Sequence, residues 1–130
     1  MLRILLSSFA AAALLCLAAL PMPVAAQGEV ADGYVAGIPD LPLMPGLKAL
    51  PDSGLVFDKP GGRIVEAFAV RDSGSRMTLQ SVIAFYDKTL PQLGWRREAP
   101  GAYLREGERL KLDLSEDAQG LTVHFRLFPQ

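Results

Sequence analysis

The stretch T-L-Q-S-V-I-A-F-Y-D-K-T-L-P-Q-L-G-W, residues 78–95, decides the fold that we expect for this chain. Its apolar side chains recur every three or four residues, which places them along one broad face of an α-helix. These residues are Leu79, Val82, Ile83, Phe85, Tyr86, Leu90 and Leu93. We interpret this face as core packing, and a ligand groove or a partner-binding face is the alternative.

Separate signals mark the two ends of this helix. Thr78 is suited to cap the first turn, because its hydroxyl accepts a hydrogen bond from an otherwise unpaired backbone N–H. Pro91 lacks a backbone donor and crowds the preceding turn, so we expect a bend or a loosened turn around residues 89–91. Gly94 stands where helices commonly adopt a left-handed residue, and Trp95 follows as the apolar residue that folds back on the last turn.

A secretory signal peptide is predicted over residues 1–26. Arg3 is followed by an apolar run over residues 4–20 and by small residues that end at Ala26, where we expect cleavage. The alternative is a retained membrane anchor, because the apolar run approaches the length that spans a bilayer. A lipoprotein signal is disfavoured because Cys16 follows a leucine rather than a small residue. We therefore predict export to the periplasm.

The exported chain has a near-neutral composition. Arg3 is the only charged residue of the leader, so 12 of the 13 basic residues and all 14 acidic residues remain, which gives a net charge of −2. No basic run indicates nucleic acid or an anionic membrane surface as a partner. Cys16 is the only cysteine, so burial rather than a disulfide has to stabilise the exported chain. The length fits one domain, with no membrane span after cleavage.

Residues 27–50 are predicted to form a flexible arm rich in Pro and Gly. Prolines recur every few residues, which forbids a helix and favours extended chain. We expect residues 27–37 to be disordered. Residues 38–47 carry large apolar side chains, so this segment either covers the core or docks on another protein. These side chains are Ile38, Leu41, Leu43, Met44 and Leu47.

Residues 51–130 are predicted to form a small α+β domain. Strand patterns occupy residues 55–57, 63–71, 102–105, 109–115 and 121–127, with a shorter candidate at 96–98. Glu106 and Gly107 are typical of a two-residue hairpin turn. The order is β-β-α-β-β-β, an antiparallel sheet of four to five strands with one amphipathic helix across one face.

The strand at residues 63–71 has apolar side chains on both faces. We expect the face with small side chains to lie under the helix, because small residues allow close approach. Its members are Val65, Ala67 and Ala69. The other face is expected to lie beneath the proline-rich arm, and its members are Ile64, Glu66, Phe68 and Val70.

The helix end and its flanking strands resemble a known group of sequences. The segment F-Y-D-K-T-L-P-Q-L-G-W, residues 85–95, lies between G-R-I-V-E-A at 62–67 and Y-L-R-E-G-E at 103–108. It resembles an uncharacterised family of small exported proteobacterial proteins that share an F-Y-x-x-T-L-P-x-L-G-W helix end. More distantly, the arrangement is similar to helix-across-sheet modules of envelope accessory proteins. The resemblance implies the fold and an envelope location, and it carries over no catalytic or binding residue.

We identify no catalytic, cofactor-binding or metal-binding residue in the sequence. His124 is in phase with the polar side of its strand, so a surface position is favoured over a general base or a metal site shared with Asp113. No serine stands in a G-x-S-x-G elbow. The segment K-P-G-G-R, residues 59–63, is interpreted as a hairpin turn, and a phosphate-binding loop is the alternative. Residues 113–120 are acidic but fail the calcium-loop pattern.

The function that we expect is that of a non-enzymatic exported envelope module, a protein-binding or accessory factor without a cofactor. Its partner, another envelope protein, would dock on residues 38–47 or on the outer sheet face. That face is expected to present Arg109, Lys111, His124 and Arg126. The alternative is a carrier for a small apolar ligand between helix and sheet, and an enzyme ranks third. The candidate partner or ligand surface comprises Ile38, Leu41, Leu43, Met44, Leu47, Tyr86 and Trp95.

Overall fold

A computed structural model describes residues 33–130, so the predicted leader and residues 27–32 lie outside the described part of the chain. The strands are β1 (Tyr34–Val35), β2 (Ile38–Pro42), β3 (Leu47–Ala49), β4 (Leu55–Lys59), β5 (Gly62–Arg71), β6 (Arg96–Ala99), β7 (Ala102–Arg105), β8 (Glu108–Asp117) and β9 (Gly120–Pro129). The helices are α1 (Leu79–Thr89) and the 3₁₀ helix η1 (Leu90–Leu93).

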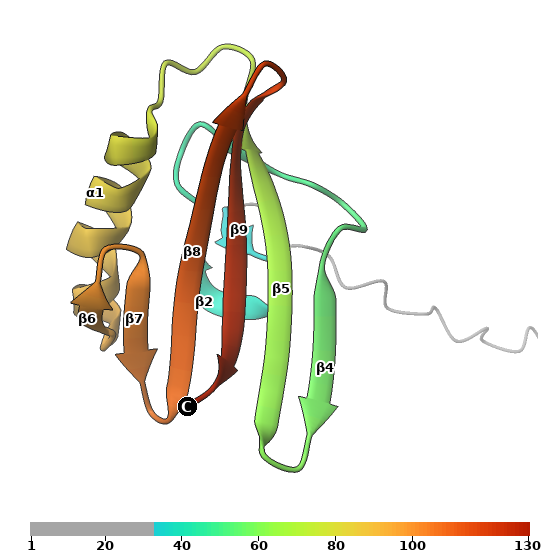
Figure 1. The fold of residues 1–130 in the computed structure, drawn as a ribbon, viewed down its shortest axis with the longest axis vertical. Helices are drawn as coiled ribbons and strands as arrows, with labels where there is room; N and C mark the ends of the chain where they lie inside the picture. The colour runs from blue at the N-terminus through green and yellow to red at the C-terminus, as the bar shows by residue number, and fades with distance from the viewer. Residues whose placement is uncertain (1–32) are drawn as a thin grey trace, which may run out of the picture.

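Seven strands form one antiparallel sheet in the order β3-β5-β9-β8-β7-β6, with β4 also paired to β5 (Figure 1). Strands β3 and β4 share one edge of β5, since Ala49 pairs with Ala69 and Leu55 pairs with Glu66. Strands β1 and β2 form a separate two-stranded ribbon. The predicted α+β class with an antiparallel sheet and one α-helix is confirmed, but the strands outnumber the prediction because residues 34–49 contribute three of them.

The helix begins and ends as its sequence predicts. The Ser81 N–H donates to the Thr78 hydroxyl at 3.1 Å, and the Thr78 N–H donates to the Ser81 hydroxyl at 2.9 Å, so two first-turn donors are satisfied reciprocally. The α-helix tightens into η1 where Pro91 removes a donor. Gly94 has a φ of 86° and turns the chain so that the buried Trp95 donates its backbone N–H to the Leu90 carbonyl at 3.1 Å.

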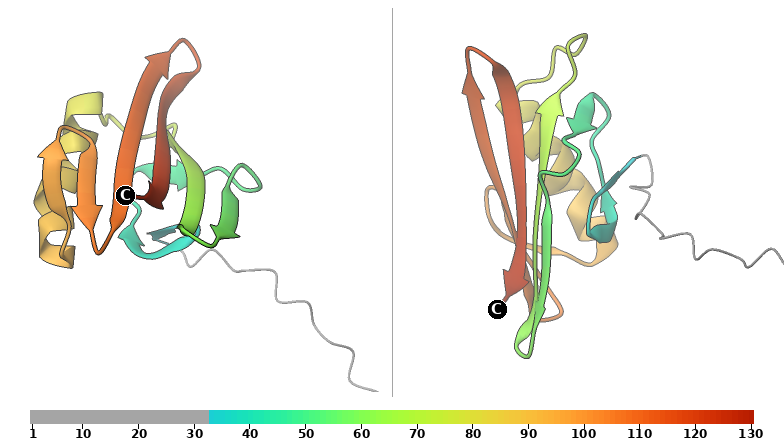
Figure 2. Two further views of the ribbon diagram at one scale, coloured as in Figure 1. Left: turned by 60° about the horizontal axis from the view of Figure 1, so that its bottom comes forward. Right: turned by 90° about the vertical axis from the view of Figure 1, so that its right-hand side faces the viewer.

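One face of the sheet carries both the helix and the N-terminal strands, and the other face is open (Figure 2). The covered face of β5 presents Val65, Ala67 and Ala69, all buried, as expected from their small size. The element over Val65 includes the N-terminal segment, because a Cβ added to Gly37 would lie 2.7 Å from the Val65 side chain. The proline-rich segment therefore covers part of the β5 face that we expected the helix to cover alone.

The expectation that this segment covers the far face of β5 is wrong. The far-face residues are Ile64, Glu66, Phe68 and Val70, and they stay half-buried. The reason is that β3 pairs with β5. This pairing places the proline-rich segment on the same face of the sheet as α1, where Ile38, Leu41 and Leu47 pack in the main core. Burial there removes three large apolar side chains from water.

Residues 33–37 are ordered, contrary to the predicted disorder of 27–37, because Val35 in β1 is buried in the same core. The ribbon tolerates its prolines, since an edge strand needs fewer backbone donors than a central one. In the described part of the chain, no helix has the length and apolar character required to cross a membrane.

Candidate ligand cavity

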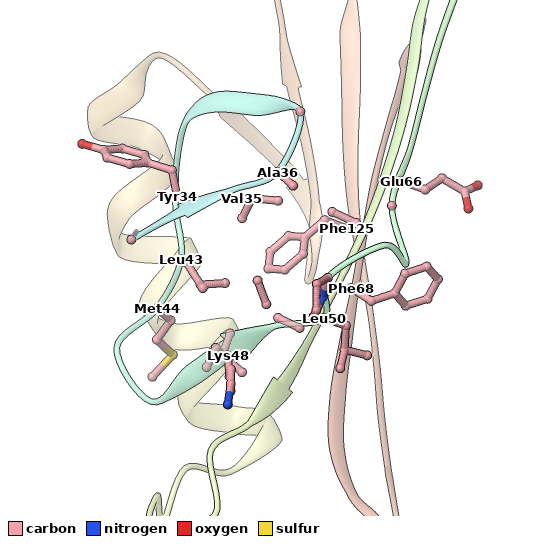
Figure 3. A pocket seen from close by; sticks show the side chains of 18 of the residues that line it. Tyr34, Val35, Ala36, Leu43, Met44, Lys48, Leu50, Glu66, Phe68 and Phe125 are labelled. Atoms are coloured by element: carbon pink, nitrogen blue, oxygen red, sulfur yellow. The ribbon is translucent and has the colours of Figure 1, made fainter. Parts of the chain in front are cut away.

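A cavity of about 730 Å³ lies between the N-terminal strands and the sheet. Residues 33–37 and 43–56 form one wall, and β5 together with Phe125 of β9 forms the other (Figure 3). The apolar residues that line it are Val35, Ala36, Leu43, Met44, Leu47, Ala49, Leu50, Val56, Ala67, Ala69 and Phe125. Leu55 and Phe68 border it, with their side chains turned toward the open face of the sheet. This composition is typical of a site for a small apolar molecule.

Small side chains on both walls leave this volume free. Ala36 faces it from the turn between β1 and β2, Ala49 faces it from β3, and Ala67 and Ala69 face it from β5. Phe125 is fully buried at the inner end, where its ring meets Tyr86 edge-on at 5.6 Å between centroids. The core is therefore closely packed behind Phe125 and loosely packed in front of it.

The mouth of the cavity opens to solvent along exposed residues. Tyr34, Leu50, Leu55 and Val56 line it with 40–56% of their surface exposed. Lys48 and Asp52, both exposed, add one charge of each sign to the lining. The Glu66 carboxylate points away from the cavity, toward the open face (Figure 3). Charged groups thus lie at the rim, and the interior presents hydrocarbon.

Tyr86 and two arginines hold the outer wall in place. The Tyr86 hydroxyl, which comes from α1, bonds the backbone of residues 42 and 44. Burial raises the pKa of Tyr86 above its ordinary range, so this hydroxyl remains a donor. Arg105 pairs with Asp40 and lies over the Trp95 ring at 4.3 Å from its centroid. Arg63 donates to the Gly37 carbonyl at 3.3 Å.

These contacts also keep the Asp40 carboxyl and the Arg63 guanidinium charged. The hydrogen bond from Arg105 holds the pKa of Asp40 below its usual value, so the ion pair persists at neutral pH. Glu108 binds Arg63 at 2.8 Å and raises its pKa further. The cavity wall is therefore anchored to the sheet by side chains from β5, β7 and α1.

The predicted surface residues divide between the core and the cavity. Ile38 and Leu41 are fully buried, as are Tyr86 and Trp95, and none of these four lines the cavity. Leu43, Met44 and Leu47 line it. Sequence reasoning missed Ala36, Ala49 and Phe125, although the small side chains noted at Ala67 and Ala69 were a usable signal for nearby space.

The open face of the sheet holds the one histidine of the chain. His124 stacks on Phe68 at 4.0 Å between ring centroids, and its Nε2 is 3.4 Å from the Glu66 carboxylate without a hydrogen bond. Asp113 binds Arg126 at 2.6 Å. Among residues 33–130 no group of three or more metal-ligating side chains is placed to hold an ion.

Residues 59–63 form the predicted hairpin turn, since Lys59 pairs with Gly62 across it. The Arg63 guanidinium donates to the Glu108 carboxylate at 2.8 Å. A second, shallower hollow of about 390 Å³ lies between α1 and β8, where Ile83 and Leu114 line it.

The fold and the cavity define a small α+β domain with an apolar site beneath its N-terminal strands. Comparison of the chain with protein-family models, with curated proteins and with solved structures gives no match.

Proposed function

We propose that this protein is a non-enzymatic exported module of the cell envelope that holds an apolar ligand in the cavity between its N-terminal strands and its sheet. The observation that carries the proposal is a volume of about 730 Å³ with hydrocarbon walls. Small-molecule sites in proteins commonly occupy about 300–1,000 Å³. The carrier function, which was the alternative in the sequence analysis, thus moves from the helix–sheet interface to the space under the N-terminal strands.

The frame around the cavity supports binding by a preformed site. The Tyr86 hydroxyl and the Arg105–Asp40 pair hold the outer wall, while Phe125 closes the inner end. A wall that is already ordered spends less conformational entropy when a ligand enters. The predicted leader supports the envelope location, where apolar molecules have to cross an aqueous compartment.

Two measurements test the proposal on the full chain expressed with its own leader. Native mass spectrometry of protein purified from the envelope is expected to show retained mass that denaturation releases. Titration with N-phenyl-1-naphthylamine, a neutral apolar fluorophore, is expected to show saturable binding.

Ala49→Phe fills the cavity from β3 and should weaken dye binding at least about tenfold, a loss of about 1.4 kcal/mol. Ala99→Phe places the same ring on the exposed strand β6 and should leave binding unchanged. The proposal is wrong if wild type carries no extra mass and no saturable dye, or if Ala49→Phe binds the dye as tightly as wild type.

Protein binding through the open face is the second candidate function. Phe68 and His124 stack there with no described element over them, and apolar Ile64 and Val70 flank them. A photo-crosslinking residue at position 68 should capture a specific envelope protein, whereas the same residue at Ala84, exposed on α1, should not. Equal capture from both positions, or none from position 68, would argue against this role.

A further inference from the structure

The two edges of the seven-stranded sheet differ in chemistry. At one edge, β6 presents Arg96, Arg97 and Glu98, and charges of this kind discourage pairing with another strand. At the other edge lies β4 (Figure 1). This strand begins with the apolar residues Leu55, Val56 and Phe57 in succession. No proline and no charge interrupts these three residues, and the charges of β4 begin only at Asp58 and Lys59. The first part of this edge therefore lacks the protection that β6 has along its length.

Strand β4 is also the most solvent-exposed apolar segment of the described chain. Leu55, Val56 and Phe57 are 54–56% exposed. Leu55 and Phe57 pair with Glu66 and Ile64 of β5 and therefore face the open side, whereas Val56 pairs with Val65 and faces the cavity side. Its outer backbone groups have no strand beside them among residues 33–130. A further strand would cover apolar side chains on both faces and satisfy these groups.

We propose that β4 pairs antiparallel with β4 of a second copy of this chain, about a two-fold axis through Val56. A two-fold axis that relates two antiparallel edge strands in this way is perpendicular to the sheet. The equivalent faces of the two copies therefore point in the same direction. Paired residues must then share a face, so the axis passes beside Leu55, Val56 or Phe57 and not between them.

Only one of these three registers matches side chains of like character. Centred on Val56, the pairing sets Val56 against itself and Leu55 against Phe57, while Asp58 and Lys59 meet Gly54 and Ser53. Centred on Leu55, it sets Asp58 against Asp52, and like charges directly opposite are destabilising. Centred on Phe57, it sets Val56 against Asp58 and buries a carboxylate beside a methyl group. The sequence of β4 is thus self-complementary in a single alignment.

The dimer joins two sheets into one, with both open faces on the same side. This inference goes beyond ligand binding, because Phe57 does not line the cavity and the readout is a mass rather than a bound dye. Short strand-edge interfaces fall in the small, weak class, so we expect a dissociation constant on the order of 10 μM.

Analytical ultracentrifugation of the full chain purified from the envelope tests the pairing across about 1 μM to 1 mM. Wild type is expected to shift from one chain to two. Phe57→Lys sets a charge against Leu55 of the other copy and should weaken the dimer at least about tenfold, while its melting temperature stays near that of wild type because the position is exposed. Ala99→Lys adds the same charge on β6 and should leave the dimer unchanged.

A cysteine placed on the axis tests the register, in a Cys16→Ser background that has no other thiol. Residues directly opposite in antiparallel strands have Cα atoms about 4.5–5.5 Å apart, within disulfide range. Val56→Cys should therefore form an intermolecular disulfide under mild oxidation. Leu55→Cys should not, since the two copies of residue 55 would be offset by two residues, beyond about 7 Å.

Any of three results would overturn the proposal. A chain that stays monomeric at about 1 mM leaves the edge to a strand of another protein or to none. A dimer that is unaffected by Phe57→Lys, or weakened equally by Ala99→Lys, has its interface elsewhere. Leu55→Cys that crosslinks as fast as Val56→Cys rules out the axis at Val56.

Discussion

The Tyr86 hydroxyl donates a hydrogen bond to the Pro42 carbonyl at 2.9 Å and so ties the middle of the helix to the end of strand β2. The same hydroxyl accepts from the Met44 N–H at 3.1 Å. One side chain therefore satisfies two backbone groups at a point where prolines leave the chain few partners of its own. The cavity wall depends on this link.

Tyr86→Phe is expected to keep the ring in place and remove both hydrogen bonds. The carbonyl of Pro42 and the N–H of Met44 then lose their partner, at a cost of about 1–3 kcal/mol. For a domain of this size we expect the melting temperature to fall by about 4–8 °C for each kcal/mol. Tyr34→Phe is the matched control, because Tyr34 is exposed, and it should melt with wild type. Equal melting of all three proteins would show that the link contributes nothing to stability.

Leu41→Ala tests whether the N-terminal strands belong to the core. Leu41 is fully buried, so truncation should cost about 2–5 kcal/mol in the free energy of unfolding measured with urea. Leu50→Ala, at a position that is 40% exposed, should cost far less. If the two variants lose the same stability, the segment is only loosely attached.

Trp95→Ala is expected to give mostly unfolded protein. Loss of a buried tryptophan typically costs about 3–5 kcal/mol, most of the stability of a small domain. Trp95→Phe should be milder, because the indole N–H has no hydrogen-bond partner among the described residues and none is lost. Far-ultraviolet circular dichroism on heating distinguishes the variants. A cooperative Trp95→Ala transition within a few degrees of wild type would contradict a core role.

Gly94→Ala isolates the backbone requirement at the helix end. A Cβ at position 94 would meet only the Arg105 side chain at an ordinary 3.6 Å, so the penalty comes from the positive φ alone. We expect a loss of about 1–2 kcal/mol in urea unfolding. Gly74→Ala is the control, since a Cβ there meets nothing within 4 Å and its φ is not positive. Loss of stability in the control alone would refute this account.

Alkaline pH should destabilise the protein through its buried tyrosines. Burial raises the pKa of Tyr86 and of Tyr103 above the ordinary 10.0. The unfolded chain therefore loses these protons first, so the stability they contribute is complete below pH 10 and falls as the pH rises above it. Each such group contributes at most about 1.4 kcal/mol per pH unit to the slope.

Tyr86→Phe should flatten this dependence between pH 10 and pH 12, so its loss of stability relative to wild type should shrink as the pH rises. The measurement is the free energy of unfolding in urea against pH, compared by slope rather than by absolute value. Identical slopes would mean that Tyr86 titrates alike in the folded and the unfolded chain.

Local patterns in the sequence were enough for the elements whose determinants are local. The Thr78 cap, the tightened turn at Pro91 and the left-handed Gly94 each depend on neighbours within a few residues. The hairpin at Glu106 and Gly107 follows the same logic, since both residues adopt the positive φ that a two-residue turn requires. Alternation along β9 placed His124 on the polar side, and the structure confirms it.

The tertiary structure alone decided which face of β5 is covered and by what. Both faces carry apolar residues, so a period of two separates Ala67 from Phe68 without saying which of them meets the core. That choice depends on the pairing of β3 with β5, a contact between residues twenty or more positions apart. The cavity and the free edge of β4 follow from it, because β3 and β4 divide one edge of β5 and leave space between them. Such pairing depends on contacts among residues that are distant in the sequence, so a local sequence pattern does not predict it.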